Sequence, residues 1–225
     1  MAKSRQLANA CDIFYTRGKA VAWFNAVTRA LGQKPAQFLE RFGQLLTKQR
    51  PDLTGEADLD DHEIWQLQRT FLKESFASGR FRGLLPLALD LADYHYHYAA
   101  ALFTPQPARP QKPRAGQLYN CAATLSPSAQ LAAFNYEILD ILEAGEPDLR
   151  RFCNDVKKCG SWALIYKAPD GGIYTESVIE PYYRMLEMMD GRTTCGEITQ
   201  KAGISWEDAR EFVEFAVAEG IIVLV

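Results

Sequence analysis

The stretch SWALIYKAPDGGIYTES, residues 161–177, decides the fold class of this 225-residue chain. Two runs rich in β-branched and aromatic residues flank APDGG, and Asp-Gly-Gly supplies the positive φ angles that a hairpin turn needs. APDGG lacks the following lysine and the strand–loop–helix order of a phosphate-binding loop, so we interpret it as a plain turn. A β-hairpin is therefore expected in a chain whose other half is helical.

The sequence around this hairpin predicts a small α+β domain over residues 118–225. Extended structure is expected as far as Phe134, followed by a short helix. After the hairpin come a helix ended by Gly191, a short helix, and a third helix that Ser205 caps. The last five residues, IIVLV, predict a buried strand. The order hairpin, three helices, strand is typical of a winged-helix-like unit.

Residues 1–103 predict a helical bundle, so the whole chain is expected to be mainly α. In AVAWFNAVTRALG, helical spacing aligns four apolar side chains, and Gly32 is a natural stop. A second helix starts at Pro35, a third at an aspartate cap, and a fourth covers residues 86–103. The aligned residues of the first helix are Val21, Phe24, Val27 and Leu31, and those of the last are Leu87, Leu91, Tyr94, Tyr98 and Leu102.

A proline-rich stretch divides the two halves. TPQPARPQKPRAGQ, residues 104–117, holds four prolines and almost no apolar side chain. Proline lacks the N–H and disfavours helix at the residue before it, so an extended linker is expected here.

The composition is that of an ordinary globular protein, with 48% apolar residues and a net charge of −3. A chain so close to neutral is a poor general binder of nucleic acid. No stretch approaches the roughly 20 apolar residues that cross a bilayer, and the N-terminus lacks an apolar signal region, which predicts a cytoplasmic protein without membrane contact. The five cysteines are widely spaced and form no C-x-x-C motif, so reduced thiols are expected.

Two histidines, His95 and His97, lie among three tyrosines in the helix at 86–103. Successive residues of a helix turn by about 100°, so these imidazoles point roughly 200° apart and cannot share a metal. No metal site is predicted. The sequence also has no nucleophile elbow, no P-loop and no dinucleotide-binding fingerprint, and therefore no catalytic residue is assigned.

The hairpin offers a possible binding element, because an open sheet edge can accept a peptide as an added strand. The alternative is a wing that only packs on its own helices. A winged helix could also bind DNA as a stand-alone protein or act as an adaptor. However, SWEDAREFVEFAVAEG carries five acidic residues and one arginine, which phosphate would repel.

Two segments of the helical half resemble the region that follows the catalytic barrel in cobalamin-binding radical S-adenosylmethionine proteins. The first carries a D-x-F-Y-x-x-G pattern and a W-F helix start, and the second an S-G-R-F helix start. Later, FNYEILDIL is similar to that family's F-x-Y-D segment, with Glu137 at the position of its aspartate. The matching residues are Asp12, Phe14, Tyr15, Gly18, Trp23 and Phe24, then Ser78, Gly79, Arg80 and Phe81.

The C-terminal residues 181–224 are similar to PqqD-like peptide-recognition domains and to winged helices, through the D-G-x-x-T and E-G-I-I motifs. The resemblance implies a non-catalytic accessory region that holds substrate or recognises a peptide. Its partners would be the cobalamin-binding and radical S-adenosylmethionine domains of the same or another chain.

The resembled enzymes use a [4Fe–4S] cluster, S-adenosylmethionine and cobalamin, but the C-x-x-x-C-x-x-C cluster loop is absent from this sequence, so no cofactor is expected on this chain. Binding is expected instead at ring and basic side chains of the helical half and at the hairpin edge. The candidate residues are Trp23, Arg80, Tyr94, Tyr98, Tyr166, Ile173 and Tyr174.

Overall fold

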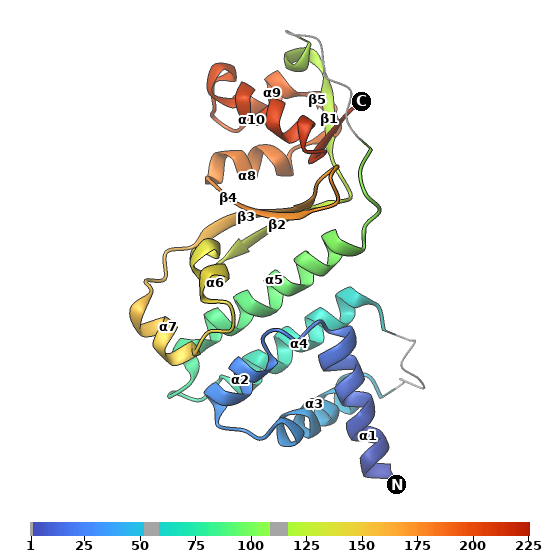
Figure 1. Cartoon of the computed structure of the whole chain (residues 1–225), viewed down its shortest axis with the longest axis vertical. Helices are drawn as coiled ribbons and strands as arrows, with labels where there is room; N and C mark the ends of the chain where they lie inside the picture. The colour runs from blue at the N-terminus through green and yellow to red at the C-terminus, as the bar shows by residue number, and fades with distance from the viewer. Residues whose placement is uncertain (1, 52–58, 109–116) are drawn as a thin grey trace. The chain divides into compact units, whose positions relative to one another are not determined.

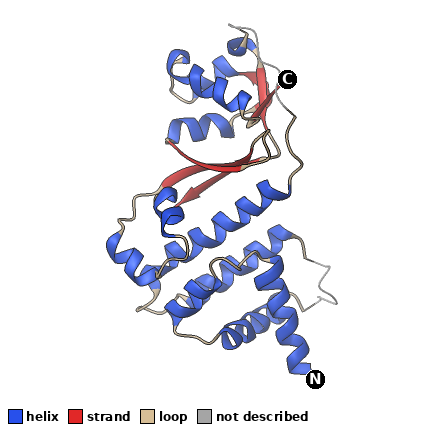
Figure 2. Cartoon of the chain, in the orientation of Figure 1, coloured by secondary structure: helices blue, strands red, loops and turns tan. Residues whose placement is uncertain are grey.

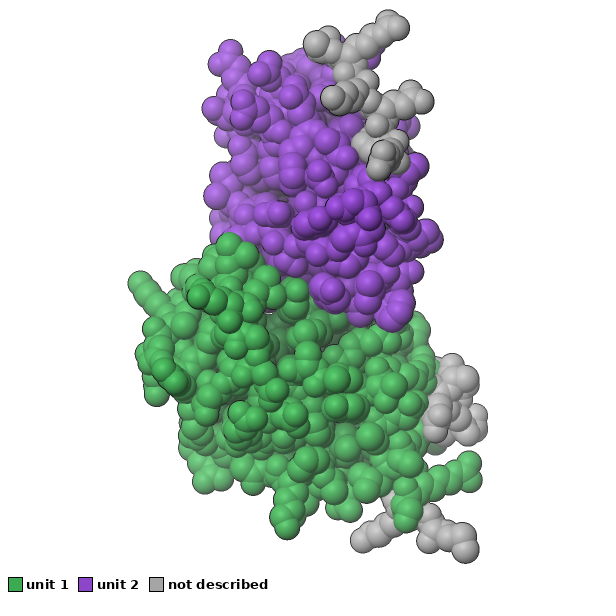
Figure 3. Space-filling view, in the orientation of Figure 1, with its two compact units in different colours: residues 1–96, 135–159 green, residues 97–134, 160–225 purple. Residues whose placement is uncertain are grey.

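The fold is mainly helical, as the sequence predicts. A computed structural model describes residues 2–51, 59–108 and 117–225. Within them lie ten α-helices and two small three-stranded antiparallel sheets (Figures 1 and 2). The chain forms two compact units, coloured separately in Figure 3: residues 1–96 with 135–159, and residues 97–134 with 160–225. The short segment at 135–159 therefore packs with the helices that precede the proline-rich stretch.

The first unit contains seven helices among its described residues, if the first two-thirds of the long α5 are counted. A π-helical turn, Asp12–Arg17, follows the first of them directly. The helices are α1 (Ala2–Cys11), α2 (Phe24–Leu31), α3 (Pro35–Gln49), α4 (Asp61–Ser75), α5 (Leu85–Phe103), α6 (Ile138–Ala144) and α7 (Leu149–Asp155).

The predicted starts and stops of these helices are confirmed at several points. Gly32 ends α2 with φ of +65°, Pro35 opens α3, and Asp60 caps α4 by accepting from the backbone N–H of Glu63 at 2.7 Å. The prediction for Val21 is wrong. It lies before α2 and is 58% exposed, because Ala20 and Trp23 form a turn there and the helix begins only at Phe24.

Aromatic rings fill the core of the first unit, with Phe14 at their centre. Its ring contacts five others in edge-to-face geometry, with ring centroids 4.8–6.2 Å apart. Those five rings belong to Trp23, Phe24, Phe38, Phe42 and Phe71. Three of the residues that carry the family resemblance, Phe14, Trp23 and Phe24, are thus buried core residues.

Gly18, another residue of that pattern, permits a close approach between the π-helical turn and α4. The side chain of Gln68 donates through Nε2 to the carbonyl oxygens of Phe14 and Gly18, at 2.9 and 2.8 Å. A Cβ at residue 18 would lie 2.3 Å from both Gln68 Nε2 and the Phe14 oxygen. Only glycine fits this position without displacing its neighbours.

The second unit holds both sheets and the remaining three helices of the described residues. One sheet has the strand order β5-β1-β6 and the other β2-β3-β4, all antiparallel. The elements are β1 (Ala122–Leu125), β2 (Ala129–Phe134), β3 (Ser161–Lys167), β4 (Ile173–Val178), α8 (Glu180–Glu187), β5 (Asp190–Thr194), α9 (Cys195–Lys201), α10 (Trp206–Ala218) and β6 (Ile222–Leu224).

The predicted hairpin is confirmed. Strands β3 and β4 pair from Lys167–Ile173 at the turn to Trp162–Val178 at the far end. In the turn, Gly171 adopts φ of +91°, and the carboxylate of Asp170 accepts from the N–H of Gly172 at 2.8 Å. One face of this sheet packs against α8, α9 and α10 around the buried side chains of Leu164, Met185 and Val213.

The C-terminal elements correct two predictions. Helix α8 ends at Glu187, and Gly191 lies instead in strand β5, which the sequence analysis missed. The residues of β5 gain hydrogen bonds by pairing with β1, which is distant in the sequence. The last strand, β6, pairs with β1 as well, but it is not fully buried: Ile222 is buried, whereas Val223 is 48% exposed at the edge of its sheet.

The predicted linker lies mostly outside the described residues, which omit 109–116. The residues before this gap belong to the second unit and pack within it. The ammonium of Lys167 donates to the carbonyl oxygens of Leu102 and Thr104, both at 2.9 Å, and Gln106 Nε2 donates to the Pro169 oxygen. These bonds fix residues 102–106 beside the β3–β4 turn.

None of the helices in the described part of the chain combines the length and the apolar character needed to span a bilayer.

Candidate functional site

The outer edge of β4 offers unpaired backbone groups. Ala168 N–H bonds to the Gly172 oxygen at 2.9 Å, which makes this the first hydrogen-bonded pair next to the turn. Because such pairs alternate along an antiparallel ladder, residues 174, 176 and 178 direct their backbone groups to β3. Residues 173, 175 and 177 direct theirs outward, where no other described strand pairs with them.

The opposite edge strand of this sheet differs in exposure. Strand β2 contains three buried residues, Ala129, Ala132 and Phe134, whereas no residue of β4 is buried. An open and exposed row of N–H and C=O groups is the structure to which a further strand can pair. Of the two edges, β4 is therefore the accessible one.

Three aromatic side chains lie along the face of the sheet beside this edge, and we call them the aromatic strip: Tyr166, Tyr174 and Phe215. Tyr166 is buried and stacks on Tyr174 with ring centroids 5.7 Å apart, and Phe215 of α10 meets Tyr166 edge to face at 6.4 Å. Tyr174 is 41% exposed and Phe215 is 37% exposed. The strip thus joins two accessible rings to a buried one.

Acidic side chains surround the aromatic strip. Burial raises the pKa of Tyr166, and the nearby charges of Glu176 and Glu219 raise it further. Asp170 accepts a hydrogen bond from Tyr174 Oη at 2.8 Å, which raises the pKa of that hydroxyl, and the charges of Asp170 and Glu219 add to the effect. No described lysine or arginine forms an ion pair with these three carboxylates. Among the described residues, the charges that act on the two tyrosines of the strip are therefore negative.

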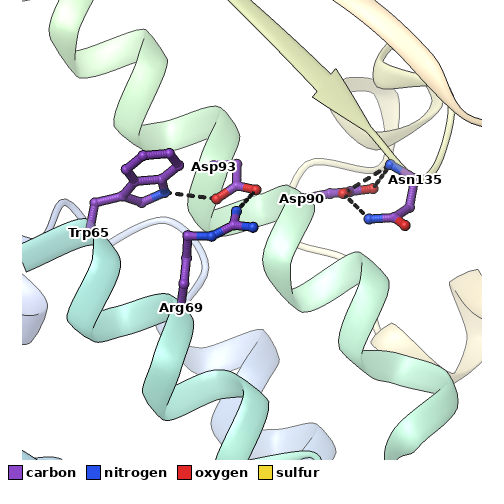
Figure 4. A network of polar contacts seen from close by, with 5 residues as sticks. All are labelled: Trp65, Arg69, Asp90, Asp93 and Asn135. Carbon is purple, nitrogen blue, oxygen red and sulfur yellow. Dashed lines mark hydrogen bonds and ion pairs between the residues drawn. The ribbon is translucent and has the colours of Figure 1, made fainter. Parts of the chain in front are cut away.

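The first unit contains a polar network around α5, drawn in Figure 4. Asp93 is 8% exposed and accepts from Trp65 Nε1 at 2.7 Å, and it pairs with the guanidinium of Arg69. The Trp65 ring stacks on Tyr96 with centroids 4.3 Å apart, and Arg69 lies over the Trp65 ring at 5.2 Å. Each of these side chains is engaged by another, so the cluster joins α4 to α5.

Asp90 lies one helical turn before Asp93 and is 1% exposed. Its carboxylate accepts from the backbone N–H groups of Asn135 and Tyr136 and from Asn135 Nδ2, at 2.8–3.0 Å. Figure 4 shows the bonds with Asn135. Burial raises the pKa of Asp90 to about 6, although these hydrogen bonds favour the charged form. The residue ties the segment after β2 to α5, 45 residues away in sequence.

The four candidate residues of the helical half are not gathered into one site. Trp23 is 1% exposed in the aromatic core, Arg80 is exposed with its guanidinium 4.4 Å from the Phe81 ring, and Tyr94 is buried. Tyr98 is half-buried, one turn after Tyr94 on α5. Leu102, predicted for the same apolar stripe, is 42% exposed, whereas Leu87 and Leu91 are buried as expected.

The three candidates of the hairpin lie together. Tyr166 and Tyr174 face each other across the ladder, and Ile173 is half-buried on the opposite face of β4. Sequence reasoning missed Phe215, Glu176 and Glu219. One local signal pointed to Glu176, because it alternates with Tyr174 on β4; Phe215 of α10 and Glu219, the residue after that helix, have no such signal.

Neither cysteines nor histidines of the described residues form a metal site, since no three metal-binding side chains are suitably grouped there. Burial lowers the pKa of His95 to about 4, so this imidazole is neutral near pH 7. Tyr136 Oη donates to Cys153 Sγ at 3.3 Å, and all five cysteines are free thiols.

Models of known protein families do not match this chain, and no curated protein matches its sequence.

Proposed function

We propose that the chain is a non-catalytic recognition module in which β4 binds an extended peptide segment as an added strand. The observation that supports this proposal is the open edge of β4. Its backbone groups at Ile173, Thr175 and Ser177 point outward, and no residue of the strand is buried. A peptide paired there would gain main-chain hydrogen bonds, and its side chains would contact the aromatic strip.

The parent system that fits this role is a cobalamin-dependent radical S-adenosylmethionine enzyme of the cytoplasm. The sequence resemblance at Asp12–Gly18 and Ser78–Phe81 supports this assignment, as does the PqqD-like order of hairpin and helices. In this proposal the cluster, S-adenosylmethionine and cobalamin are bound by other domains of the same or a partner chain. The helical unit would then contribute to holding substrate.

Recognition of nucleic acid by the winged-helix-like half is disfavoured by the charge of α10. Its exposed surface carries Glu207, Asp208, Glu211 and Glu214, of which only Glu214 pairs with an arginine, Arg210, at 3.7 Å. Phosphate groups would be repelled by this helix.

Strand addition can be tested with peptides selected for binding to the full chain from a random twelve-residue display library. Binding is measured by fluorescence polarisation against the wild type, Thr175→Pro and Thr175→Ala. Proline at residue 175 removes one outward N–H but leaves the ladder to β3 intact, whereas alanine keeps the N–H. We expect Thr175→Pro to weaken binding by about tenfold or more, as the loss of roughly 1.4 kcal/mol implies, and Thr175→Ala to bind like the wild type.

Equal binding by the proline variant and the wild type would refute strand addition at this edge. Circular dichroism and the melting temperature of each variant show whether the fold is retained. The assignment to a cobalamin-dependent enzyme is tested separately. We expect a reading frame with C-x-x-x-C-x-x-C in the same or an adjacent gene, and we expect the chain to co-purify with a cobalamin-dependent enzyme. Absence of both would contradict the assignment.

A further inference from the structure

We infer that the β4 edge selects basic peptides, with lysine or arginine at alternate positions on the face of the aromatic strip. This inference rests on the proposed strand addition and names the class of peptide that the site accepts. Three observations support it: the rings are exposed, carboxylates lie near them, and Lys167 of the hairpin donates its hydrogen bonds to other residues.

The rings supply the contact surface. A strand added beside β4 places every second side chain next to Tyr174 and Glu176, because residues i and i+2 share one face of a strand. The exposed ring of Tyr174 is available to the stem of a lysine or to a guanidinium plane. The other side chains of the peptide would lie beside Ile173, the apolar residue on the opposite face.

The carboxylates near the aromatic strip favour a positively charged peptide. Glu176 points to the same face as Tyr174, and Glu219 follows Phe215 by one helical turn. Both charges raise the pKa of Tyr166, the buried ring of the strip. Asp170 adds a third negative charge at the turn. A cation on the incoming strand would therefore be attracted, and a carboxylate there would be repelled.

The one basic residue of the hairpin is engaged away from this face. The Lys167 ammonium donates to the Leu102 and Thr104 oxygens at 2.9 Å, and residue 167 alternates with Tyr166, so its side chain leaves the sheet on the other side. Within the described residues, the basic side chain of the hairpin thus does not neutralise the strip. Because no described lysine or arginine forms an ion pair with Asp170, Glu176 or Glu219, a cation on the incoming peptide can pair with them.

The inference is tested with three synthetic eight-residue peptides in which valine alternates with lysine, glutamine or glutamate. Their dissociation constants for the full chain are measured by fluorescence polarisation at 50 mM and 300 mM salt. We expect the lysine peptide to bind about tenfold more tightly than the glutamine peptide at low salt, the glutamate peptide to bind most weakly, and the lysine advantage to shrink at high salt.

The matched variants locate the effect. Glu176→Gln/Glu219→Gln removes two charges beside the strip, and Glu143→Gln/Glu187→Gln removes two exposed charges on α6 and α8. The first variant should reduce the lysine advantage to about twofold, while the second should leave it nearly unchanged.

The outcomes separate the two proposals. If lysine and glutamine peptides bind equally and Thr175→Pro abolishes both, the edge binds strands but charge selection is refuted. If both double variants reduce the lysine advantage equally, the attraction is general and the inference is also refuted. If no peptide binds, or Thr175→Pro binds all of them like the wild type, the proposed function falls and the inference falls with it.

Discussion

Tyr174 stacks on Tyr166 across the β3–β4 hairpin, with ring centroids 5.7 Å apart and the ring planes inclined by 28°. The pair joins an edge strand that has no buried residue to a central strand in the core. One ring is thus anchored in the core of the second unit, and the other is displayed beside the open edge.

The stacking predicts a modest contribution to stability. Tyr174→Ala should lower the free energy of unfolding by about 1 kcal/mol, because a cross-strand aromatic pair contributes roughly 0.5–1.5 kcal/mol. Tyr174→Phe keeps the ring and loses only the exposed hydrogen bond to Asp170, so it should stay within about 0.5 kcal/mol of the wild type. Urea unfolding measures both. Equal losses in the two variants would assign the effect to the hydroxyl instead of the ring.

Gly18 should tolerate no side chain. Gly18→Ala places Cβ 2.3 Å from Gln68 Nε2 and from the Phe14 oxygen, so it must displace Gln68 and break a buried hydrogen bond. We expect a loss of about 2–3 kcal/mol in urea unfolding. Gly79→Ala is the control, because no atom lies within 4 Å of a Cβ there, and it should change stability by less than about 0.5 kcal/mol. Similar behaviour of the two variants would show that the close contact is not stabilising.

Arg69 should be needed to compensate the buried charge of Asp93. Arg69→Met leaves that carboxylate with Trp65 as its remaining partner in the network, which predicts a loss of about 2–3 kcal/mol. Arg151→Met removes a solvent-exposed pair with Asp155 on α7 and should cost less than about 0.5 kcal/mol. Chemical denaturation compares the two. A loss in Arg69→Met no greater than in Arg151→Met would mean that the network contributes little.

Asp90 predicts a specific pH dependence. Its pKa rises from 3.8 to about 6 on folding, so between these values the folded chain binds more protons than the unfolded chain. The free energy of unfolding should therefore fall as the pH rises from about 4 to 6, by up to about 3 kcal/mol, and this contribution should stay constant above that range. Asp90→Asn, which does not titrate, should lack this fall. Parallel pH profiles of the variant and the wild type would contradict the raised pKa.

Much of the fold follows from local signals in the sequence. The turn at Asp170–Gly172, the stop at Gly32 and the cap at Ser205 each depend on neighbours within a few residues, and all three were predictable. Strand β5 was not, because DGRTT becomes a strand only through pairing with β1, about 70 residues earlier. The bond between Asp90 and Asn135 depends in the same way on a contact across 45 residues.

The residues of the candidate site also differ in whether local sequence signals could reveal them. Tyr166 and Tyr174 could be found from the hairpin alone, since the turn sets their register. Phe215 and Glu219 could not, because α10 reaches the hairpin only through tertiary packing. Trp23 was selected for its ring and proved to be a core residue, which sequence patterns do not distinguish from an exposed platform.

The most direct test of strand addition is amide-resolved hydrogen exchange of β4 with a bound peptide, followed by NMR. The N–H groups of Ile173, Thr175 and Ser177 point outward, whereas those at 174, 176 and 178 already bond to β3. The account predicts that saturating peptide slows exchange at the first three by about tenfold or more and changes the other three much less. Unchanged exchange at residues 173, 175 and 177, while the peptide is bound, would contradict it.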